Sequence, residues 1–391
     1  LMLFVSAPAV TFLYTVRREQ AEMFVLPIGA DKLAGAVRTL RTALDATGVR
    51  NLQDINAYPT TAAFELYKVL FSAAEHLLQG VRQLIVVPDG ALQSLPLSVL
   101  VTEAQKSPPA NLADYRQVPW LAKRFAVTVL PSVSSLRALR MFAAKARAPK
   151  PFIGFGDPLL KGHPGGQRSA SLAALFSRGS GLADPAQVKQ LPALPETATE
   201  LRMLATSLGA GPDAIILRNQ ATETRVKTLD LKAARIVAFA THGLMAGDFE
   251  KVGEPSLVLT PPETASPLDD GLLTASEVTQ LDLNADLVIL SACNTAAPDG
   301  TPGAEGLSGL AKAFFYAGSR SLMVSHWPVA SRAAVKLTTR MLADMVADPT
   351  IGRSEALRRS RMALMEDSEE PFYAHPMFWA PFVIVGEGGN I

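Results

Sequence analysis

The sequence predicts an α/β protein with a largely parallel sheet flanked by helices. Apolar strand-like runs alternate with amphipathic helical runs along most of the chain, the pattern of strands joined by crossover helices. Apolar residues make up 48% of the 391 residues and charged residues 19%, which is ample for a globular core. At about 150 residues per domain, this length predicts two domains or one large α/β unit.

The N-terminal part is predicted to begin with three meandering strands, at residues 2–5, 9–16 and 22–26. Apolar residues at helical spacing then indicate helices at 31–47 and 61–78. Strands at 84–88 and 125–130 and a helix at 133–144 follow. The Pro- and Lys-rich residues 145–151 are the candidate boundary, so we predict domains at 1–148 and 149–391.

The second domain is predicted to open with a strand at 152–155. Residues 156–188 are rich in Gly, Ser, Pro and Ala and too long for an ordinary connection, which predicts a functional loop or a disordered segment. Further strands are predicted at 214–217, 235–240, 256–259, 287–291, 321–325 and 378–385. The helices between them are predicted at 197–208, 222–228, 305–317, 332–346 and 354–365, with a loop at 294–303.

Composition argues against several classes of protein. The net charge is +1, and no dense Lys/Arg run is interleaved with aromatic residues, so we expect no nucleic-acid contact. The uncharged residues 1–16 are shorter than the roughly 18–20 apolar residues that span a bilayer, and they lack the basic start of a signal peptide. A single cysteine fits a reducing compartment, so we expect a cytoplasmic protein. Because the chain begins with Leu1 rather than Met, we expect it to be a piece of a longer protein.

Two predicted strands end in residues that suit covalent catalysis. The only cysteine, Cys293, follows the strand at 287–291, and His242 follows the strand at 235–240. The carboxyl ends of parallel strands meet at one edge of a sheet, where catalytic groups collect. A thiol beside an imidazole is the minimal set for a cysteine nucleophile, and the backbone N–H groups of Gly243 and Cys293 are candidate oxyanion donors. The alternative is that Cys293 is a small hydrophobic core residue.

The other histidines and the glycine motifs are weaker candidates. We expect His76 to be a surface or packing residue, His326 to be structural and His375 to shape a turn, while His163 falls in the long loop. No HxH, HxxxH or CxxC pattern occurs, so we expect neither a metal nor a cofactor. Gly154-Phe155-Gly156 lacks the third glycine of a dinucleotide fingerprint, so a turn is predicted there and a nucleotide-binding protein is a minor rival.

Segments spread over most of the chain resemble, in order and spacing, the CHAT peptidases, caspase-like domains often attached to tetratricopeptide repeats. They are the strand-and-turn at 84–96, the histidine motif at 239–243, the cysteine motif at 290–295, and the segments at 303–307, 317–321, 327–329 and 375–382. One departure is visible, because Ala330-Ser331 stand where the family commonly has acidic residues.

The resemblance implies a caspase/gingipain/separase-like cysteine endopeptidase. It implies a three-layer α/β/α sandwich with a mostly parallel sheet, preceded by a smaller, degenerate caspase-like α/β half at 1–148 that lacks the catalytic pair. It maps the catalytic histidine onto His242, the nucleophile onto Cys293, and the oxyanion donors onto Gly243 and Cys293. It also implies that upstream repeats bind an activating protein partner.

Substrate specificity is predicted by the same resemblance. Several relatives cut after Arg or Lys with the help of an acidic pocket residue, and Asp248, Asp299 and Glu305 are the candidates here; each is otherwise a solvated charge. With such a preference, Arg168 and Arg178 become candidate self-cleavage sites. The expected partner is a protein or peptide substrate. The rival from another class is a catalytically silent interaction module with the same fold.

Overall fold

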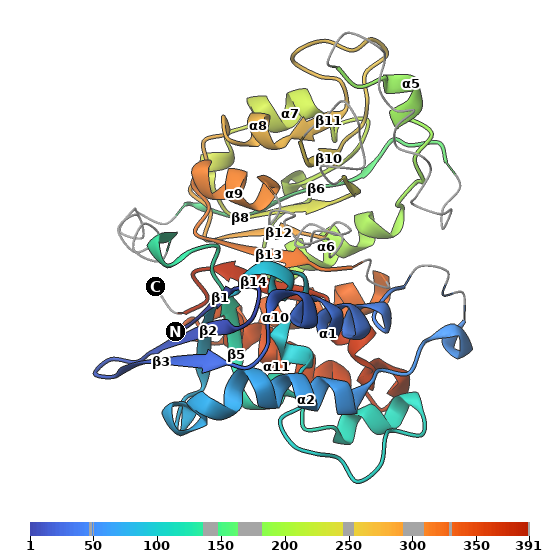
Figure 1. The fold of residues 1–391 in the computed structure, drawn as a ribbon. Coiled ribbons are helices and arrows are strands. Elements are labelled where there is room, and N and C mark those ends of the chain that lie inside the picture. The colour runs from blue at the N-terminus through green and yellow to red at the C-terminus, as the bar shows by residue number, and fades with distance from the viewer. Residues whose placement is uncertain are drawn as a thin grey trace. The chain divides into compact units, whose positions relative to one another are not determined.

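The computed structural model describes residues 1–46, 49, 51–135, 148–162, 182–244, 254–291, 309–327 and 331–389. These residues form two compact units, drawn in Figure 1. The first unit holds the described residues up to 135 and those from 325 onward, and the second holds 148–291 and 309–324. The chain therefore changes unit close to the predicted boundary at 148, but its C-terminal part returns to the first unit. That the two parts fold as separate domains stays a prediction.

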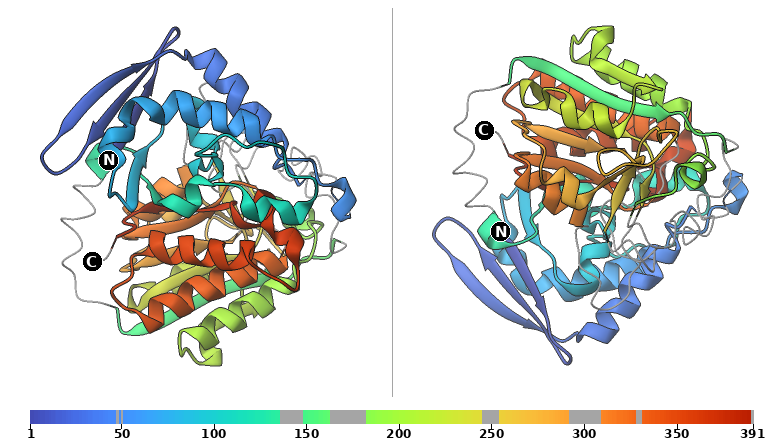
Figure 2. Two further views of the ribbon diagram at one scale, coloured as in Figure 1. Left: turned by 90° about the horizontal axis from the view of Figure 1, so that it is seen from below. Right: turned by 90° about the horizontal axis from the view of Figure 1, so that it is seen from above.

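The first unit is built on six strands in the order β3-β2-β1-β4-β5-β14. Their bounds are β1 Met2–Ser6, β2 Thr11–Val16, β3 Ala21–Leu26, β4 Gln83–Val87, β5 Ala126–Val129 and β14 Phe382–Gly386. β1, β2 and β3 pair antiparallel, as the predicted meander requires, and β1, β4, β5 and β14 pair parallel. Figure 2 shows the hairpin of β2 and β3 extending from the rest of this unit.

The helices of the first unit are α1 Ala30–Thr42, α2 Thr60–Phe71, α3 Leu121–Arg124, α10 Ser331–Ala347, α11 Arg353–Met365 and α12 Pro376–Trp379. One face of β1 is buried by α2, where the ring of Phe4 lies 6.4 Å from that of Phe71. α11 packs against the neighbouring helix α10 and against the strands β5 and β14. α2 and α11 therefore each bury an apolar side against strands of the same unit.

Three predicted elements of the first unit have different bounds in the structure. The helix predicted at 31–47 ends at Thr42. The helix predicted at 61–78 ends at Phe71, whose φ of −118° leaves the α-helical range, and continues as 3-10 turns over Ser72–Leu78. The strand predicted at 378–385 is wrong at its start, because Pro376 opens the short helix α12 and the His375 ring accepts a hydrogen bond from the Met377 N–H.

The second unit contains five strands in the order β13-β12-β8-β6-β7. The last residue of β13, Ser325, is assigned to the first unit. Their bounds are β6 Lys150–Pro158, β7 Ile215–Arg218, β8 Ala234–Ala240, β12 Leu287–Leu290 and β13 Ser321–Ser325. All neighbouring pairs among them are parallel. A small antiparallel sheet, β11-β10-β9, lies beside them, with β9 at Gly243–Leu244, β10 at Ser256–Val258 and β11 at Leu272–Thr274.

Helices cover both faces of the five-stranded sheet. The helices of the second unit are α5 Pro185–Val188, α6 Glu196–Ser207, α7 Glu223–Thr228, α8 Ala275–Val278 and α9 Gly309–Tyr316, and α6 and α9 lie on opposite faces of this sheet. On one face, Phe155 and Phe239 stack with 5.3 Å between ring centres, and Phe314 of α9 lies 5.5 Å from Phe239. On the other face, Leu201 of α6 fills the space beside Gly154. The second unit is therefore a helix–sheet–helix sandwich.

The prediction of a turn at Gly154-Phe155-Gly156 is wrong, because these residues lie inside β6. A Cβ atom on Gly156 would stand 2.7 Å from the Leu201 side chain and 2.9 Å from the Ala240 carbonyl oxygen. The two glycines therefore let α6 approach the sheet closely, and Leu201 occupies the space above them. The nucleotide-binding rival thereby loses the glycine loop on which it depended.

The predicted mixed α/β fold with a mostly parallel sheet is confirmed. The short elements β9, β11, α3, α5 and α8 were missed, since two to four residues carry too little periodicity to detect. Parts of the predicted helices at 133–144 and 305–317, and most of the long loop at 156–188, lie outside the described residues. No helix in the described part of the chain is both long and apolar enough to cross a bilayer.

Candidate active site

His242 lies where the chain passes from β8 into β9. β8 sits between β6 and β12, and it ends at Ala240. The backbone of β10 holds the next residues from one side: the Val258 N–H donates to the His242 carbonyl oxygen at 2.9 Å, and the Thr241 hydroxyl donates to the Val258 carbonyl oxygen. The position of His242 is thus determined by two sheets, and not by an isolated loop.

The imidazole of His242 is 4% exposed and its Nε2 lies 2.7 Å from the carbonyl oxygen of Pro192. A carbonyl oxygen only accepts hydrogen bonds, so Nε2 carries the proton and donates. In the neutral ring the other nitrogen, Nδ1, then carries the in-plane lone pair and is the basic atom. The contact with Pro192 therefore selects one tautomer and one ring orientation.

Pro192 is itself held by backbone contacts with Gly162. The Gly162 N–H donates to the Leu191 carbonyl oxygen at 3.0 Å, and the Ala193 N–H donates to the Gly162 carbonyl oxygen at 3.1 Å. The two segments run so close that a Cβ on Gly162 would stand 2.3 Å from the Gln190 carbonyl oxygen. Sequence reasoning missed Pro192, because a carbonyl oxygen is present at every residue and only the fold selects one.

The strand that precedes Cys293 lies beside the strand that precedes His242. β12 and β8 pair parallel, with Leu290 opposite Phe239, and the Ser291 N–H donates to the Phe239 carbonyl oxygen at 2.9 Å. The carboxyl ends of the two strands are therefore neighbours at one edge of the sheet, as the sequence predicted.

Several predicted site residues fall outside the described part of the chain. Cys293, Asp299 and Glu305 belong to residues 292–308, and Asp248 belongs to residues 245–253. Gly243 is described, as the first residue of β9 opposite Leu257 of β10. The pairing of His242 with Cys293, the oxyanion donors and the specificity residues stay predictions.

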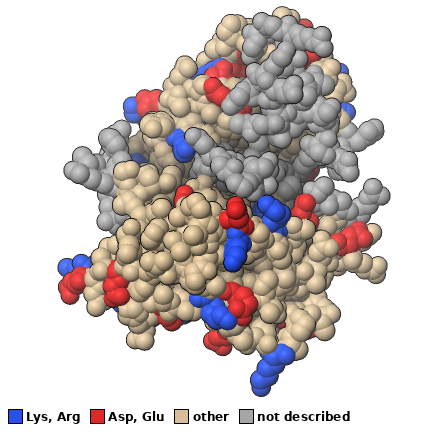
Figure 3. All heavy atoms as spheres, viewed as in Figure 1, with Lys and Arg blue, Asp and Glu red and all other residues tan. Residues whose placement is uncertain are grey.

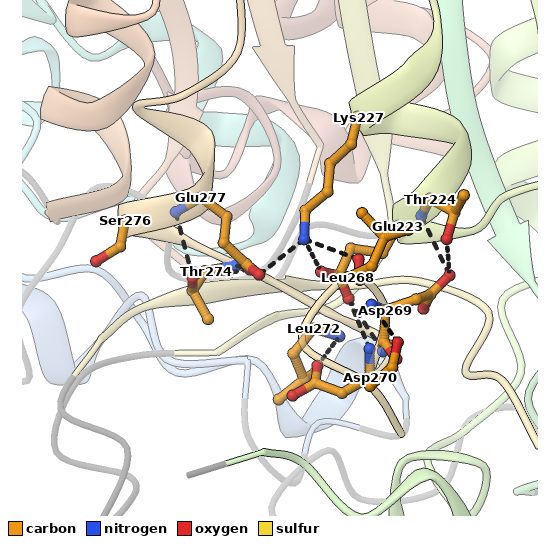
Figure 4. A network of polar contacts seen from close by, with 12 residues as sticks. Glu223, Thr224, Lys227, Leu268, Asp269, Asp270, Leu272, Thr274, Ser276 and Glu277 are labelled. Carbon is orange, nitrogen blue, oxygen red and sulfur yellow. Dashed lines mark hydrogen bonds and ion pairs between the residues drawn. The ribbon is translucent and has the colours of Figure 1, made fainter. Parts of the chain in front are cut away.

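A buried ion network supports the small sheet that holds the His242 backbone (Figure 4). The Lys227 ammonium contacts both Glu223 and Glu277, the latter at 2.8 Å. Glu223 also accepts the backbone N–H groups of Asp270, at 3.0 Å, and Gly271, at 3.2 Å, in the turn that leads into β11. This network therefore ties α7 and α8 to the start of β11.

Burial and hydrogen bonding shift the pKa values of the two carboxyls of this network in opposite directions. Burial raises the pKa of Glu223 to about 8, although Lys227 and the backbone N–H groups act in the opposite direction. For Glu277 burial alone would raise the pKa, but hydrogen bonds from Lys227 and Thr274 outweigh it and lower the pKa. Two carboxyls share one ammonium group, and the more buried one holds its proton more tightly.

The other described histidines belong to the first unit. His326 is 4% exposed, and burial, with Arg41 and Arg361 nearby, lowers its pKa well below the ordinary value. Burial also lowers the pKa of His375, to about 3, and this residue caps α12. His76 is exposed and lies 3.3 Å from Glu22. Both buried rings are thus neutral at physiological pH and serve packing and capping.

Charged groups on the described surface are mixed in sign. Figure 3 shows Lys and Arg interspersed with Asp and Glu on the face in view. Among the described residues no group of three or more His, Cys, Asp or Glu side chains is placed to hold a metal ion.

The described structure is that of a mixed α/β protein that presents a histidine of fixed tautomer at the end of a parallel strand. A family model described as the CHAT domain matches residues 60–387. The chain therefore belongs to the CHAT domain family, which confirms the resemblance seen in the sequence.

Similar proteins include tetratricopeptide repeat protein 28 of Mus musculus and of Homo sapiens. Each is 26% identical over 337 residues, and the match covers 78% of this chain but only 12% of the relative. Among solved structures, the Arg-specific cysteine proteinase gingipain R is 11% identical with a TM-score of 0.44, covering 93% of this chain and 76% of that one. Separase in the Saccharomyces cerevisiae separase–securin complex is 10% identical with a TM-score of 0.49, covering 100% of this chain and 30% of that one.

Proposed function

We propose that this chain is a cysteine endopeptidase domain in which His242 activates Cys293. The observation that carries the proposal is the bond from His242 Nε2 to the Pro192 carbonyl oxygen, 2.7 Å long, at the end of the strand that neighbours β12. A general base needs a defined basic atom, and this bond makes Nδ1 that atom.

The proposed reaction begins when Nδ1 of His242 takes the proton from the Cys293 thiol. The thiolate attacks the carbonyl carbon of the scissile peptide, and the carbonyl electron pair moves to the oxygen. The N–H groups of Gly243 and Cys293 are the proposed donors to that oxyanion. As the intermediate collapses, the imidazolium gives its proton to the leaving amine, the C–N bond breaks, and a thioacyl-enzyme forms. Water then hydrolyses the thioester with His242 as the base.

The Pro192 carbonyl contributes in both halves of this cycle. Its negative end faces the Nε2–H group, so it stabilises the positive charge that develops on the imidazolium. It also prevents the ring from rotating about its Cβ–Cγ bond while the proton moves. The Pro192 carbonyl therefore helps to hold the base in place.

A labelling experiment tests the proposal directly, because Cys293 is the only thiol in the chain. A peptidyl thiol-directed electrophile is reacted with wild type, Cys293→Ala, His242→Ala and the matched control His76→Ala, which replaces an exposed histidine of the first unit. We expect His242→Ala to slow labelling and peptide hydrolysis by about 10²–10⁴-fold, while His76→Ala matches wild type. Labelling at equal rates in wild type and His242→Ala would contradict the proposal.

The second candidate function is a catalytically silent interaction module. It is supported by the curated relatives, which are named for tetratricopeptide repeats and of which this chain spans only 12%. The same repeats support the proposal that an activating protein partner binds outside this chain. A thiol that labels slowly and regardless of His242 favours the module.

The substrate preference is proposed as Arg or Lys before the cut, with Asp248, Asp299 or Glu305 recognising the cation. A positional-scanning peptide library on wild type and Cys293→Ala tests it, and replacing each carboxylate by its amide identifies the residue. Arg168 and Arg178, in residues outside the described part of the chain, are the proposed self-cleavage sites. An intact chain by mass spectrometry in a sample that cuts Arg substrates would rule out self-cleavage. A cytoplasmic location stays part of the proposal.

A further inference from the structure

Glu200 is a buried carboxyl close to the end of β12. It lies on the second turn of α6 and is 4% exposed. The Ser291 hydroxyl donates to its Oε2 at 3.2 Å, and within the described structure its Oε1 has no hydrogen-bond partner. A half-satisfied carboxyl inside a protein costs free energy, so its presence calls for a specific explanation.

Ser291 is the last described residue before Cys293, which follows two positions later. Its backbone N–H makes the final bond of the β12–β8 ladder, to Phe239. Its side chain makes the bond to Glu200 on the covering helix. The last described residue before Cys293 is thus held from two directions.

The segment just before this helix contacts the histidine. The segment that leads into α6 contains Pro192, whose carbonyl oxygen accepts from His242. α6 is tied to β6, because the Thr197 hydroxyl accepts the Asp157 N–H at 2.8 Å and Leu201 packs above the glycines of that strand. α6 and the segment that leads into it therefore contact both strand ends, through Glu200 on the helix and Pro192 on the segment.

We propose that Glu200 is a positioning residue, which holds the end of β12 against α6 so that Cys293 is presented to His242 at the correct distance. The inference rests on the proposed cysteine peptidase function. Glu200 acts through Ser291 and does not touch the substrate. Its role is to limit the movement of the strand end, in the way that supporting residues orient a catalytic group.

The charge of Glu200 gives this role a pH signature. Burial raises its pKa to about 7, the Ser291 hydroxyl opposes this, and Glu196 one turn earlier adds to it. On the strands under α6, the Asp157 carboxylate of β6 is paired with Arg218 of β7. The neighbouring strand, β8, leads into His242. Glu200 therefore loses its proton near neutral pH. The ionised form only accepts from Ser291, whereas the protonated form also donates.

Alkylation of Cys293 by iodoacetamide, followed from pH 5.5 to 9, tests the proposal without a peptide substrate. The variants are Glu200→Gln, which keeps the size and hydrogen bonding, Glu200→Ala, and Ser291→Ala. The control is Ser207→Ala, at the far end of α6. It removes a hydroxyl that donates to the Met203 carbonyl oxygen within the same helix. His242→Ala defines the part of the rate that depends on the histidine.

We expect Glu200→Ala and Ser291→Ala to slow the His242-dependent alkylation about tenfold, the equivalent of one lost hydrogen bond to a charged group. Glu200→Gln should recover most of the rate but lose the inflection near pH 7, and Ser207→Ala should match wild type. If Glu200→Ala does not fold, the Gln and Ser291 variants still decide the question.

The proposal is overturned if the variants that fold reproduce the wild-type rate and pH profile, or if they lower thermal stability alone. If instead His242→Ala is alkylated as fast as wild type, the proposed cysteine peptidase function itself is contradicted. The two failures are distinguishable, because the first leaves the dependence on His242 intact.

Discussion

The sharpest prediction about stability concerns Lys227. The Lys227 side chain is 17% exposed, and its ammonium group contacts Glu223, Glu277 and the Leu268 carbonyl oxygen. Lys227→Met keeps the length of the side chain but removes the only ammonium group in contact with these two carboxylates among the described residues. Glu223, which is 1% exposed, is then left with backbone N–H donors alone.

Removal of one partner from a buried ion pair costs about 3–5 kcal/mol, because the other charge remains in a medium of low polarity. Glu223 ionises in the folded chain at about pH 8, far above an exposed glutamate. A raised carboxyl pKa means that the folded state is favoured at low pH and loses stability as the pH rises through that value. In Lys227→Met the pKa of Glu223 rises further, because the ammonium group that lowered it is gone. The loss is therefore expected to be larger at pH 9 than at pH 6, where a proton on Glu223 relieves the buried charge.

The matched control is Lys232→Met in the same unit. Lys232 lies 2.7 Å from Asp282, but the two side chains are 59% and 71% exposed. Water and salt screen exposed pairs, so this variant should differ little from wild type. It makes the same chemical change without the burial.

Amide hydrogen exchange is the suitable assay, because all three tryptophans, Trp120, Trp327 and Trp379, belong to the first unit. Peptides that cover β10 and β11 should exchange faster in Lys227→Met and normally in Lys232→Met. Adding Glu223→Gln to Lys227→Met should recover part of the loss, since the orphaned charge is gone. Equal losses of protection in the two lysine variants at pH 9 would refute the reasoning.

Two further predictions follow from the histidines. Because burial holds the pKa of His375 near 3, the unfolded chain binds one more proton from pH 6.5 downward, and stability falls by about 1.4 kcal/mol per pH unit as the pH drops. His375→Asn keeps an acceptor for the cap. The free energy of unfolding, measured by tryptophan-monitored urea unfolding at pH 4.5–6.5, should depend less steeply on pH in this variant, by the equivalent of one bound proton. Parallel plots of unfolding free energy against pH for the two proteins would contradict this. Gly162→Ala should push the backbone near Pro192 and cost about 1–3 kcal/mol. The Nε2–H of His242 should shift in nitrogen-15 spectra and hydrolysis should slow about tenfold; an unchanged ring spectrum would show that the segment absorbs the methyl group.

Periodicity alone located most of the long elements. The run at 235–240 lies within β8, the run at 287–291 overlaps β12 almost completely, and both are apolar on two faces, as strands inside a parallel sheet must be. That pattern also placed His242 and Ser291 at strand ends. It failed at 378–381, where Pro376 and His375 start a helix in a stretch as apolar as a strand.

Local pattern reasoning sees only residues within one or two turns of each other. The sequence by itself therefore determined the α/β class, the strand that carries His242 and the strand that precedes Cys293. Only the tertiary structure decided what surrounds them. The Pro192 carbonyl that orients His242 is 50 residues away along the chain, and the Glu200 carboxyl that holds Ser291 is 91 residues away. Such contacts arise when α6 packs onto β6. Local secondary-structure preferences do not indicate which carbonyl or carboxyl group that packing will bring to the strand ends.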